Sequence, residues 1–375
     1  MRIALEITGA LGGGGYKRYT ENILRGLAEE GPEHEYVLFG VFRSGFPERA
    51  HALDVPKGRN WRFELRRFPQ GLLFPLEEWL GLRYHERFLS ALGADIVHGL
   101  GSRTPPLDRI PSTLTLHFSG LWPFENPWDR FYFNSMTERG VRQSPKVIAI
   151  SEFCKKEAVK AWGTRPEKIE VIHYGGPESA FAPGEGAGDS SKPPYFLFVG
   201  ITRPQKNPKL LVEAFCRMKA KHPELPHRLV FAGGHGEDKP WIEERLKKAG
   251  LLGQAEFTGL IPQSEIHRVF QGAFACVCPS LDEGFALTAG EARGCGVPGI
   301  GVDAGALPET IADAGLVPAP EPDAVAEAMA KLALDPGLRE DLRARGLKRA
   351  KDFSWNTAAR KTLAVYKDIL SGASR

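Results

Sequence analysis

Short apolar segments alternate with longer segments of helical periodicity along the whole chain. The apolar runs predict strands, and stretches such as 17–30 and 152–162 space their apolar residues as amphipathic helices do. Strands that alternate with helices are typical of α/β folds with parallel sheets. The predicted strands are 2–7, 35–42, 61–68, 95–98, 113–117, 146–150, 169–172, 195–199, 228–232, 255–258, 275–278 and 299–302.

The alternation is interrupted between residues 181 and 194. This stretch is rich in Gly, Pro and Ser and lacks periodicity, which predicts a linker. The chain of 375 residues also exceeds the size at which a single hydrophobic core usually stops growing. We therefore predict two doubly wound domains, 1–180 and 181–355, which bind ligands in the loops at the carboxyl ends of their strands.

Composition narrows the class of protein. The formal net charge of +3 is small for this length and argues against a dedicated nucleic-acid partner. The five cysteines form no CxxC pair, so we expect buried apolar residues in a reducing compartment rather than disulfides or metal ligands. We find no signal-peptide pattern and no run of about 18 apolar residues, and we predict a cytoplasmic location.

A glycine-rich loop, 8–16, follows the first predicted strand and precedes a helix. Its glycines, Gly14 and Gly15 among them, would let the backbone approach a ligand, and the amino terminus of the helix favours an anion. The glycine spacing fits neither a Walker A loop nor the dinucleotide-binding fingerprint. A merely flexible turn is the alternative.

A second loop, after strand 195–199, begins at Gly200 and carries Arg203 and Lys206 beside the start of a helix. Two cations at such a place suit a diphosphate. Solvated surface charges would produce the same pattern, because Arg and Lys are mostly exposed.

The third loop follows strand 275–278 and contains Glu283. The next helix is expected to begin near Phe285, which would place Glu291 about two turns inside it. Carboxylates accept strong hydrogen bonds from sugar hydroxyls, while the helix terminus can hold phosphate. The alternative is an acidic helix start favoured by the helix dipole alone.

Glu283 and Glu291, with seven residues between them, resemble the E-x7-E motif of the retaining family 4 glycosyltransferases (glycosyl transferases group 1). Arg203 and Lys206 match that family's Arg and Lys pair. The likeness covers nearly the whole chain. It implies the GT-B fold, two Rossmann-like domains with parallel sheets that face across a deep cleft. The first domain would bind the acceptor, the second the nucleotide-sugar, and a helix at 356–375 would return to the first. Further matching stretches are 95–98, 115–117, 147–151, 257–260 and 305–309.

The resemblance also implies residue roles. Glu291 would hold the donor ribose, and Glu283 the transferred sugar. His117 would lie near that sugar; a general-base role and a structural or donor-binding role both stay open. The implied catalytic residues are Glu283, Arg203, Lys206 and His117, and the implied donor-binding residues are Gly14, Gly15, Gly200, Gly259, Leu260, Gly284, Phe285, Ala286, Leu287, Thr288 and Glu291.

The sequence contains no Asp-x-Asp metal motif, so we predict a transferase without a metal or other cofactor, in which Arg203, Lys206 and helix dipoles stabilise the leaving diphosphate. The family implies transfer with retention, in which a donor phosphate oxygen takes the acceptor proton and no protein nucleophile is needed. The expected partners are a UDP- or GDP-sugar and a sugar, glycolipid or other hydroxyl acceptor of bacterial cell-surface polysaccharide or glycolipid synthesis.

Two departures from the family pattern stand out. The segment His173-Tyr174-Gly175-Gly176-Pro177 replaces the usual Asn-Gly-Val-Asp, which predicts a different hinge, and Gly290 before Glu291 predicts close packing there. Three alternatives remain: a sugar-nucleotide epimerase on the same fold, a non-catalytic nucleotide-sugar-binding protein, and a glycogen- or sucrose-type synthase, which the short chain disfavours.

The segment 59–89 is basic and aromatic, as segments that lie on membrane surfaces often are. It predicts peripheral contact with the cytoplasmic face of the inner membrane, and an ordinary strand and helix is the alternative. At the carboxyl end, Asn356 is expected to cap the last helix, with Leu363, Tyr366 and Leu370 on one face. The residues behind the membrane prediction are Trp61, Arg62, Phe63, Arg66, Arg67, Phe68, Leu72, Leu73, Phe74, Trp79 and Arg83.

Overall fold

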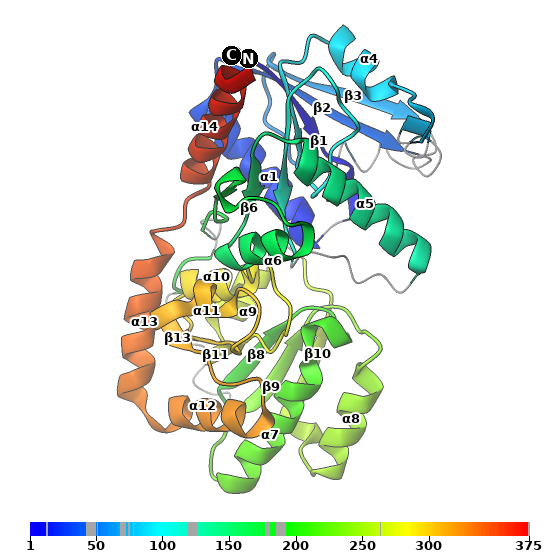
Figure 1. Ribbon diagram of the computed structural model, residues 1–375. Coiled ribbons are helices and arrows are strands. Elements are labelled where there is room, and N and C mark those ends of the chain that lie inside the picture. Colours follow the sequence, from blue (N-terminus) through cyan, green and yellow to red (C-terminus); the bar gives the residue numbers. More distant parts are fainter. Residues whose placement is uncertain are drawn as a thin grey trace. The chain divides into compact units, whose positions relative to one another are not determined.

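A computed structural model describes residues 1–12, 14–42, 50, 52–67, 73, 76–77, 79–118, 126–176, 181–184, 193–262 and 264–373. The chain divides into two compact units, Met1–Gly175 with Ser354–Arg375, and Gly176–Phe353 (Figure 1). The domain limits at 180/181 and 355/356 stay predictions, because most of the stretch 177–192 lies outside the described residues.

The first unit is built on a parallel sheet with the strand order β3-β2-β1-β4-β5-β6-β7. Its helices precede or follow these strands along the chain, as the alternating pattern predicts. The strands are β1 (Arg2–Glu6), β2 (Glu35–Phe42), β3 (Trp61–Arg67), β4 (Ile96–Gly99), β5 (Ser112–Leu116), β6 (Val147–Ala149) and β7 (Ile169–Val171), and the helices are α1 (Gly14–Glu30), α4 (Tyr84–Ala91), α5 (Pro127–Gln143), α6 (Glu152–Trp162) and α14 (Trp355–Ala373).

The second unit repeats this design with the order β10-β9-β8-β11-β12-β13. Apolar residues of β8, β9 and β11 form the centre of its core together with α7, α10 and α12. The strands are β8 (Tyr195–Val199), β9 (Arg228–Ala232), β10 (Ala255–Gly259), β11 (Ala275–Val277), β12 (Gly299–Ile300) and β13 (Gly315–Leu316), and the helices are α7 (Pro208–Lys221), α8 (Lys239–Lys248), α9 (Ile266–Gln271), α10 (Leu287–Gly294), α11 (Leu307–Ile311), α12 (Pro322–Leu334) and α13 (Pro336–Ala350).

The predicted α/β class and parallel sheets are confirmed, and every predicted strand is present with ends shifted by at most two residues. Strand β13 was not predicted, because its two residues at the sheet edge carry no periodicity. The predicted burial of the five cysteines is also confirmed. No helix within the described ranges is both long and apolar enough to span a bilayer.

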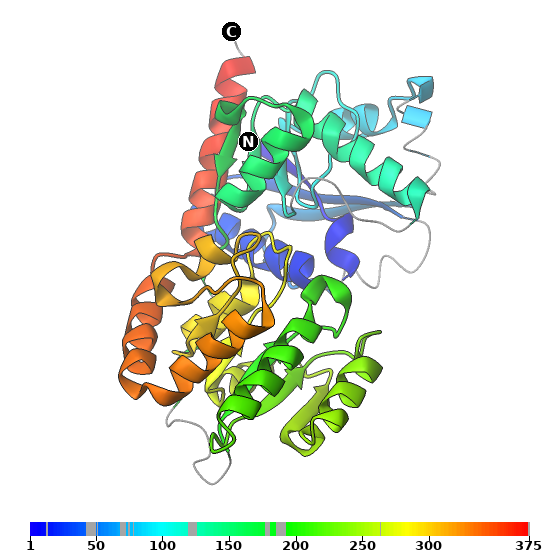
Figure 2. The same cartoon turned by 60° about the horizontal axis from the view of Figure 1, so that its bottom comes forward.

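Helix α14 lies along α1 in the first unit (Figures 1 and 2). Gly26 of α1 makes the close approach possible, because a Cβ there would lie 2.7 Å from the Trp355 carbonyl oxygen. Arg360 adds a two-pronged ion pair to Glu30, with both N–O distances 2.9 Å. Close packing and an ion pair therefore both hold α14 against α1.

The capping prediction for this helix is wrong. Asn356 is the second residue of α14, and its side-chain amide donates to Glu29 Oε2 at 2.7 Å. The Ser354 hydroxyl instead accepts a hydrogen bond from the Thr357 N–H at 3.4 Å. The predicted inner face is present: Leu363 and Tyr366 are buried, and Tyr366 reaches the His98 ring at 2.5 Å.

Candidate functional site

The two sheets share one feature that positions ligands in folds of this kind. In the second unit the chain leaves β8 toward β9 on one side and reaches β11 on the other, so β8 and β11 flank a topological switch point. In the first unit β1 and β4 do the same. Ligands of open α/β sheets bind in the crevice at the carboxyl ends of such strands.

The loop after β8 begins at Gly200, whose φ of +146° is open only to glycine. It continues through a short 3-10 turn to Asn207, which starts α7 in a left-handed conformation with φ 48°. The Asn207 side-chain amide donates to the Pro279 carbonyl at 3.2 Å and so ties this loop to the one after β11. Arg203 is exposed, and its guanidinium makes no hydrogen bond or ion pair with any residue that the structure describes.

Lys206 and Glu283 meet across the switch point of the second unit. The Lys206 Nζ atom lies 2.5 Å from Glu283 Oε1, although the two residues are 77 positions apart. Their side chains are 32% and 16% exposed, so ligands can reach both. The pair is close to neutral, and the two loops carry one further exposed cation, Arg203, and one further exposed carboxylate, Asp282.

The backbone around Glu283 is held in a defined shape by the loop after β12. The Ala306 N–H donates to the Glu283 carbonyl at 2.8 Å, and the Thr310 hydroxyl donates to the Phe285 carbonyl at 2.5 Å. A Cβ on Gly305 would lie 2.8 Å from the Glu283 nitrogen, which explains a glycine there. Segment 305–309 carried part of the family resemblance, but the sequence assigned it no such function.

Helix α10 begins at Leu287, not near Phe285 as predicted. Ala286 adopts a left-handed conformation, with φ 59°, and Gly284 and Phe285 belong to the loop that it closes. Glu291 is consequently about one turn inside the helix, where it is 4% exposed. Leu287 and Thr288 form the half-buried first turn.

The close packing predicted at Gly290 is absent. A Cβ there would meet only the far end of Arg293, at 3.8 Å, which is an ordinary contact. An alanine would therefore fit at this position, and the structure offers no packing reason for the glycine.

Gly259 ends β10 and Leu260 follows it, and β9 separates this strand from the switch point. Gly259 has φ +70°, and Leu260 is 83% exposed. A Cβ on Gly234 would meet both Leu260, at 3.6 Å, and Ile201, at 3.5 Å. The loops after β8, β9 and β10 thus lie together and present a small apolar surface next to the charged cluster.

In the first unit, Gly14 and Gly15 are the first residues of α1 and both are exposed. Gly14 has φ +66°, and a Cβ there would meet nothing within 4 Å. The backbone is therefore accessible at the amino terminus of a 17-residue helix, as an anion-binding role would need.

His117 follows β5 in a cluster of aromatic rings. Its Nε2–H donates to the Leu100 carbonyl at 2.7 Å, and its Nδ1 accepts from the Tyr174 hydroxyl. The rings of Tyr16 and Tyr19 lie 4.7 and 4.5 Å from the imidazole. Burial lowers the His117 pKa to about 3, so the ring is neutral with both nitrogens engaged. This geometry favours the structural interpretation of His117 over a general base.

Tyr174 was missed as a functional candidate, although its segment stood out as a departure from the family pattern. Besides its bond to His117, its ring stacks on Trp355 at 5.7 Å. A Cβ on Gly175 would lie 2.2 Å from Trp355, and one on Gly176 would lie 2.7 Å from the Phe353 carbonyl oxygen. Gly175 and Gly176 therefore let the chain pass the segment that carries Phe353 and Trp355.

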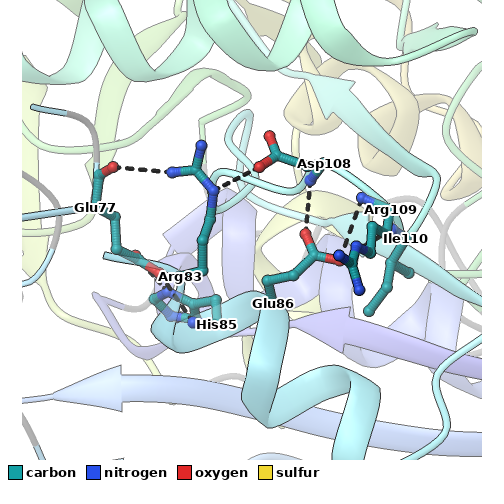
Figure 3. Close-up of polar contacts among 7 residues, drawn as sticks. All are labelled: Glu77, Arg83, His85, Glu86, Asp108, Arg109 and Ile110. Atoms are coloured by element: carbon teal, nitrogen blue, oxygen red, sulfur yellow. Dashed lines mark hydrogen bonds and ion pairs between the residues drawn. The ribbon is translucent and has the colours of Figure 1, made fainter. Parts of the chain in front are cut away.

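A polar network joins the segment before α4 to the loop after β4 (Figure 3). Glu77 is fully buried and accepts from the His85 N–H at 2.9 Å and from the His85 ring at 2.6 Å. Glu86 accepts three backbone N–H bonds, from Asp108, Arg109 and Ile110. Every carboxylate oxygen of these two buried glutamates therefore has a partner.

Across the described ranges, no group of three His, Cys, Asp or Glu side chains is arranged to hold a metal ion.

Two family models match the chain. Residues 13–175 match "Glycosyltransferase Family 4", and residues 186–349 match "Glycosyl transferases group 1". The two matches fall on the two structural units and leave only short stretches of the chain unmatched.

Among curated proteins, the chain is similar to a D-inositol 3-phosphate glycosyltransferase of Kribbella flavida. The two are 32% identical over 245 residues, which cover 61% of this chain and 58% of that protein. It is also similar to the O-antigen chain mannosyltransferase B of Escherichia coli, with 25% identity over 94% of this chain and 96% of the relative.

Solved structures show the same fold. Sucrose-phosphate synthase from Thermosynechococcus elongatus superposes with a TM-score of 0.76 at 20% identity, over 99% of this chain and 100% of that chain. The length of the chain therefore does not separate it from a sucrose-type synthase, and that argument from the sequence is wrong. The Anabaena protein HepE in complex with UDP and glucose gives a TM-score of 0.72 at 16% identity, over 97% of this chain and 98% of that chain. With both halves matched by family models and the fold shared with these structures, the chain belongs to the GT-B glycosyltransferases of family 4 and group 1.

Proposed function

We propose that the protein transfers a sugar from a UDP- or GDP-sugar to a hydroxyl acceptor, with retention of configuration and without a bound metal ion. The observation that carries the proposal is the Lys206–Glu283 ion pair, 2.5 Å long, beside the exposed Arg203 at the switch point of the second unit. Cations of this kind bind diphosphates, and a carboxylate accepts hydrogen bonds from sugar hydroxyls.

The Lys206–Glu283 pair also suits a reaction in which negative charge develops on a leaving diphosphate. A donor diphosphate would compete with Glu283 for Lys206, and its charge grows as the sugar departs. Lys206, Arg203 and the N–H groups at the start of α10 would stabilise that charge, which is the task a metal ion performs in other transferases. Glu283, partly released from Lys206, would then accept hydrogen bonds from the transferred sugar.

The similar proteins support the choice of ligands. The HepE structure contains UDP and glucose, which favours a nucleotide-sugar donor. The names of the relatives refer to an inositol phosphate and to the O-antigen chain, and both favour a hydroxyl acceptor. We extend this to a sugar or glycolipid of the bacterial cell surface.

Thermal unfolding in the presence of UDP, GDP, UDP-glucose and GDP-mannose tests the donor, because a ligand that binds only the native state raises the melting temperature. At least one nucleotide should raise it equally with and without EDTA. Loss of the shift in EDTA would contradict metal independence, and no shift with any of the four would contradict the donor class. NMR of the product then reports the anomeric configuration, and an epimer formed from donor alone would favour the epimerase.

Peripheral contact with a membrane belongs to the same proposal. The first unit exposes a group of large apolar side chains that we name the aromatic patch: Trp79 (61% exposed), Leu80 (75%), Trp128 (53%) and Phe131 (55%). The rings of Trp79 and Trp128 lie 6.3 Å apart. Contiguous exposed apolar surface of this kind marks an interaction site, and tryptophans favour the membrane interface.

The polar network of Figure 3 anchors the segment that carries Trp79 on both sides. The Arg83 guanidinium donates to the Glu77 carbonyl and to Asp108, at 3.3 and 2.5 Å. Hydrogen bonds of Glu77 and Arg83 thus hold the chain on both sides of Trp79, which would lower the entropy lost when this ring binds.

Sedimentation with phosphatidylglycerol vesicles tests the membrane contact. Trp79→Ser combined with Trp128→Ser should reduce the bound fraction several-fold, whereas Trp241→Ser, which removes an exposed tryptophan of the second unit, should not. Equal binding of all three proteins would refute a role for the aromatic patch.

A further inference from the structure

Glu6 is an exception among the buried acids of the first unit. It ends β1 at the switch point and is 6% exposed. Its Oε1 accepts from the Thr8 N–H at 3.1 Å, but its buried Oε2 meets no hydrogen-bond donor among the described residues. The hydroxyl oxygen of Thr8 is likewise buried and has no partner there.

Two other buried acids of this unit provide the contrast. Glu77 and Glu86 are as buried as Glu6, yet both oxygens of each accept hydrogen bonds. Leaving a buried carboxylate oxygen without a donor costs free energy, so native proteins rarely do it outside functional sites. The fold satisfies Glu77 and Glu86 and leaves Glu6 and Thr8 with capacity for further hydrogen bonds.

The surface next to Glu6 consists of backbone. A Cβ on Gly9 would lie 3.4 Å from the Gly101 Cα, and a Cβ on Gly101 would lie 4.0 Å from Glu6 Oε2. The same loop, through the Leu100 carbonyl, also holds His117. The backbones of Gly9 and Gly101 thus pack closely beside the carboxylate, at the end of the sheet where α/β folds bind ligands.

The negative charge of Glu6 determines which kind of ligand can bind beside it. Among the described residues Glu6 makes no ion pair, so its carboxylate would itself repel a phosphate placed beside it. A hydroxyl instead donates a charge-assisted hydrogen bond to a carboxylate. The diphosphate-binding features, Arg203 and Lys206, belong to the second unit.

We infer that Glu6 and Thr8 form a subsite for hydroxyl groups of a neutral acceptor sugar or polyol, in which Glu6 Oε2 accepts a hydroxyl hydrogen and the Thr8 hydroxyl completes the contact. The inference rests on the proposed glycosyl transfer. Glu6 binds and orients the acceptor in this assignment, and no proton transfer to it is required.

The test compares Glu6→Gln with the wild-type protein and with Glu86→Gln, which alters a fully hydrogen-bonded carboxylate. Nucleotide release from UDP-glucose and GDP-mannose is measured with methyl α-mannoside, methyl α-glucoside or myo-inositol as acceptor probe, and without a probe. Glu6→Gln should raise the KM of the active probe roughly 10- to 100-fold, as expected for losing a hydrogen bond to a charged group. Probe-independent hydrolysis and the thermal shift by nucleotide should stay unchanged.

Melting temperatures separate a binding role from a structural one. Glu6→Gln removes an uncompensated buried charge, so its melting temperature should equal or exceed that of the wild type, whereas Glu86→Gln should lower it by several degrees. A lower melting temperature for Glu6→Gln with an unchanged probe KM would show that Glu6 is structural and that its free oxygen is met by an ordered water only.

The other possible outcomes of the experiment also test the assignment of Glu6 and Thr8. A wild-type protein that binds nucleotide but responds to none of the three probes, or that prefers an amino sugar to the glucoside tenfold, would overturn the assignment to neutral hydroxyls. A protein that binds no nucleotide would instead contradict the proposed function, so the two failures are distinguishable.

Discussion

The two units place very different chemistry at the same position of the same strand order. At the switch point of the second unit, Lys206 and Glu283 form an ion pair beside the exposed Arg203. In the first unit, Glu6 stands at the switch point with no ion-pair partner among the described residues, and the neutral imidazole of His117 lies after β5 within aromatic rings. The sheet topology thus places both clusters at strand ends where α/β sheets bind ligands, and the loop side chains give the two places different charge.

This difference corresponds to a division of labour. Under the proposed function, Arg203 and Lys206 stand where a diphosphate would bind, and Glu6, which pairs with no cation among the described residues, stands where a neutral polyol would bind. Substitutions in the second unit should therefore change turnover and donor binding, whereas those in the first should change acceptor binding and stability.

The largest effect is expected from Glu283→Gln. The substitution keeps the side-chain volume but removes the charge that is balanced against Lys206 and offered to the sugar. Loss of one preorganised electrostatic contact typically lowers turnover about 100- to 1,000-fold. Steady-state kinetics with a verified donor and acceptor measure it, with Asp282→Asn as the matched neighbouring control. Wild-type turnover in Glu283→Gln would contradict the role proposed for Glu283 in sugar transfer.

Arg203→Ala should weaken donor binding by roughly 10- to 100-fold, as loss of a charge-assisted hydrogen bond does. Its melting temperature should not change, because the exposed guanidinium makes no contact within the described structure. Titration calorimetry with UDP or GDP measures the affinity, and Arg217→Ala on α7, which removes an exposed arginine that pairs with Asp323, is the control. Unchanged affinity would mean that Lys206 acts alone.

Tyr174→Phe should act on stability only. It removes the hydroxyl that donates to His117 Nδ1 and leaves that nitrogen buried, at a cost of about 1–3 kcal/mol in the free energy of unfolding. Denaturant titration gives this value. Nucleotide affinity should stay at the wild-type value, and a matching loss of affinity would show that the aromatic cluster takes part in donor binding.

A further prediction concerns pH. Burial lowers the pKa of His98 and of His117 to about 3, below the value near 6.5 of the unfolded chain. Between pH 3 and 6.5 the unfolded state binds more protons than the folded state. The contribution of the two neutral histidines to the free energy of unfolding is therefore fully present above pH 6.5 and is lost progressively as the pH falls toward 3. Melting temperatures from pH 7 to 4 should decline less steeply for His117→Gln than for the wild type. Parallel profiles would contradict the lowered His117 pKa.

Much of the fold could be predicted from the sequence, because its evidence is local. Apolar runs and helical periodicity located the strands, and the glycine-rich, basic and acidic loops could be assigned to strand ends. The errors arose where tertiary contacts override local preference. Ala286 takes a left-handed conformation next to Phe285, whose carbonyl accepts from the Thr310 hydroxyl, and α10 starts only at Leu287.

What the sequence by itself determined is therefore the α/β architecture, the burial of the cysteines and the residue types available in each loop. Only the tertiary structure decided which of them meet. It paired Lys206 with Glu283 across 77 residues, bonded both nitrogens of His117 to Tyr174 and Leu100, and satisfied Glu86 while leaving one oxygen of Glu6 without a donor among the described residues. The physical reason is that periodicity follows from backbone geometry over a few residues, whereas hydrogen-bond partners depend on contacts between residues far apart in the chain.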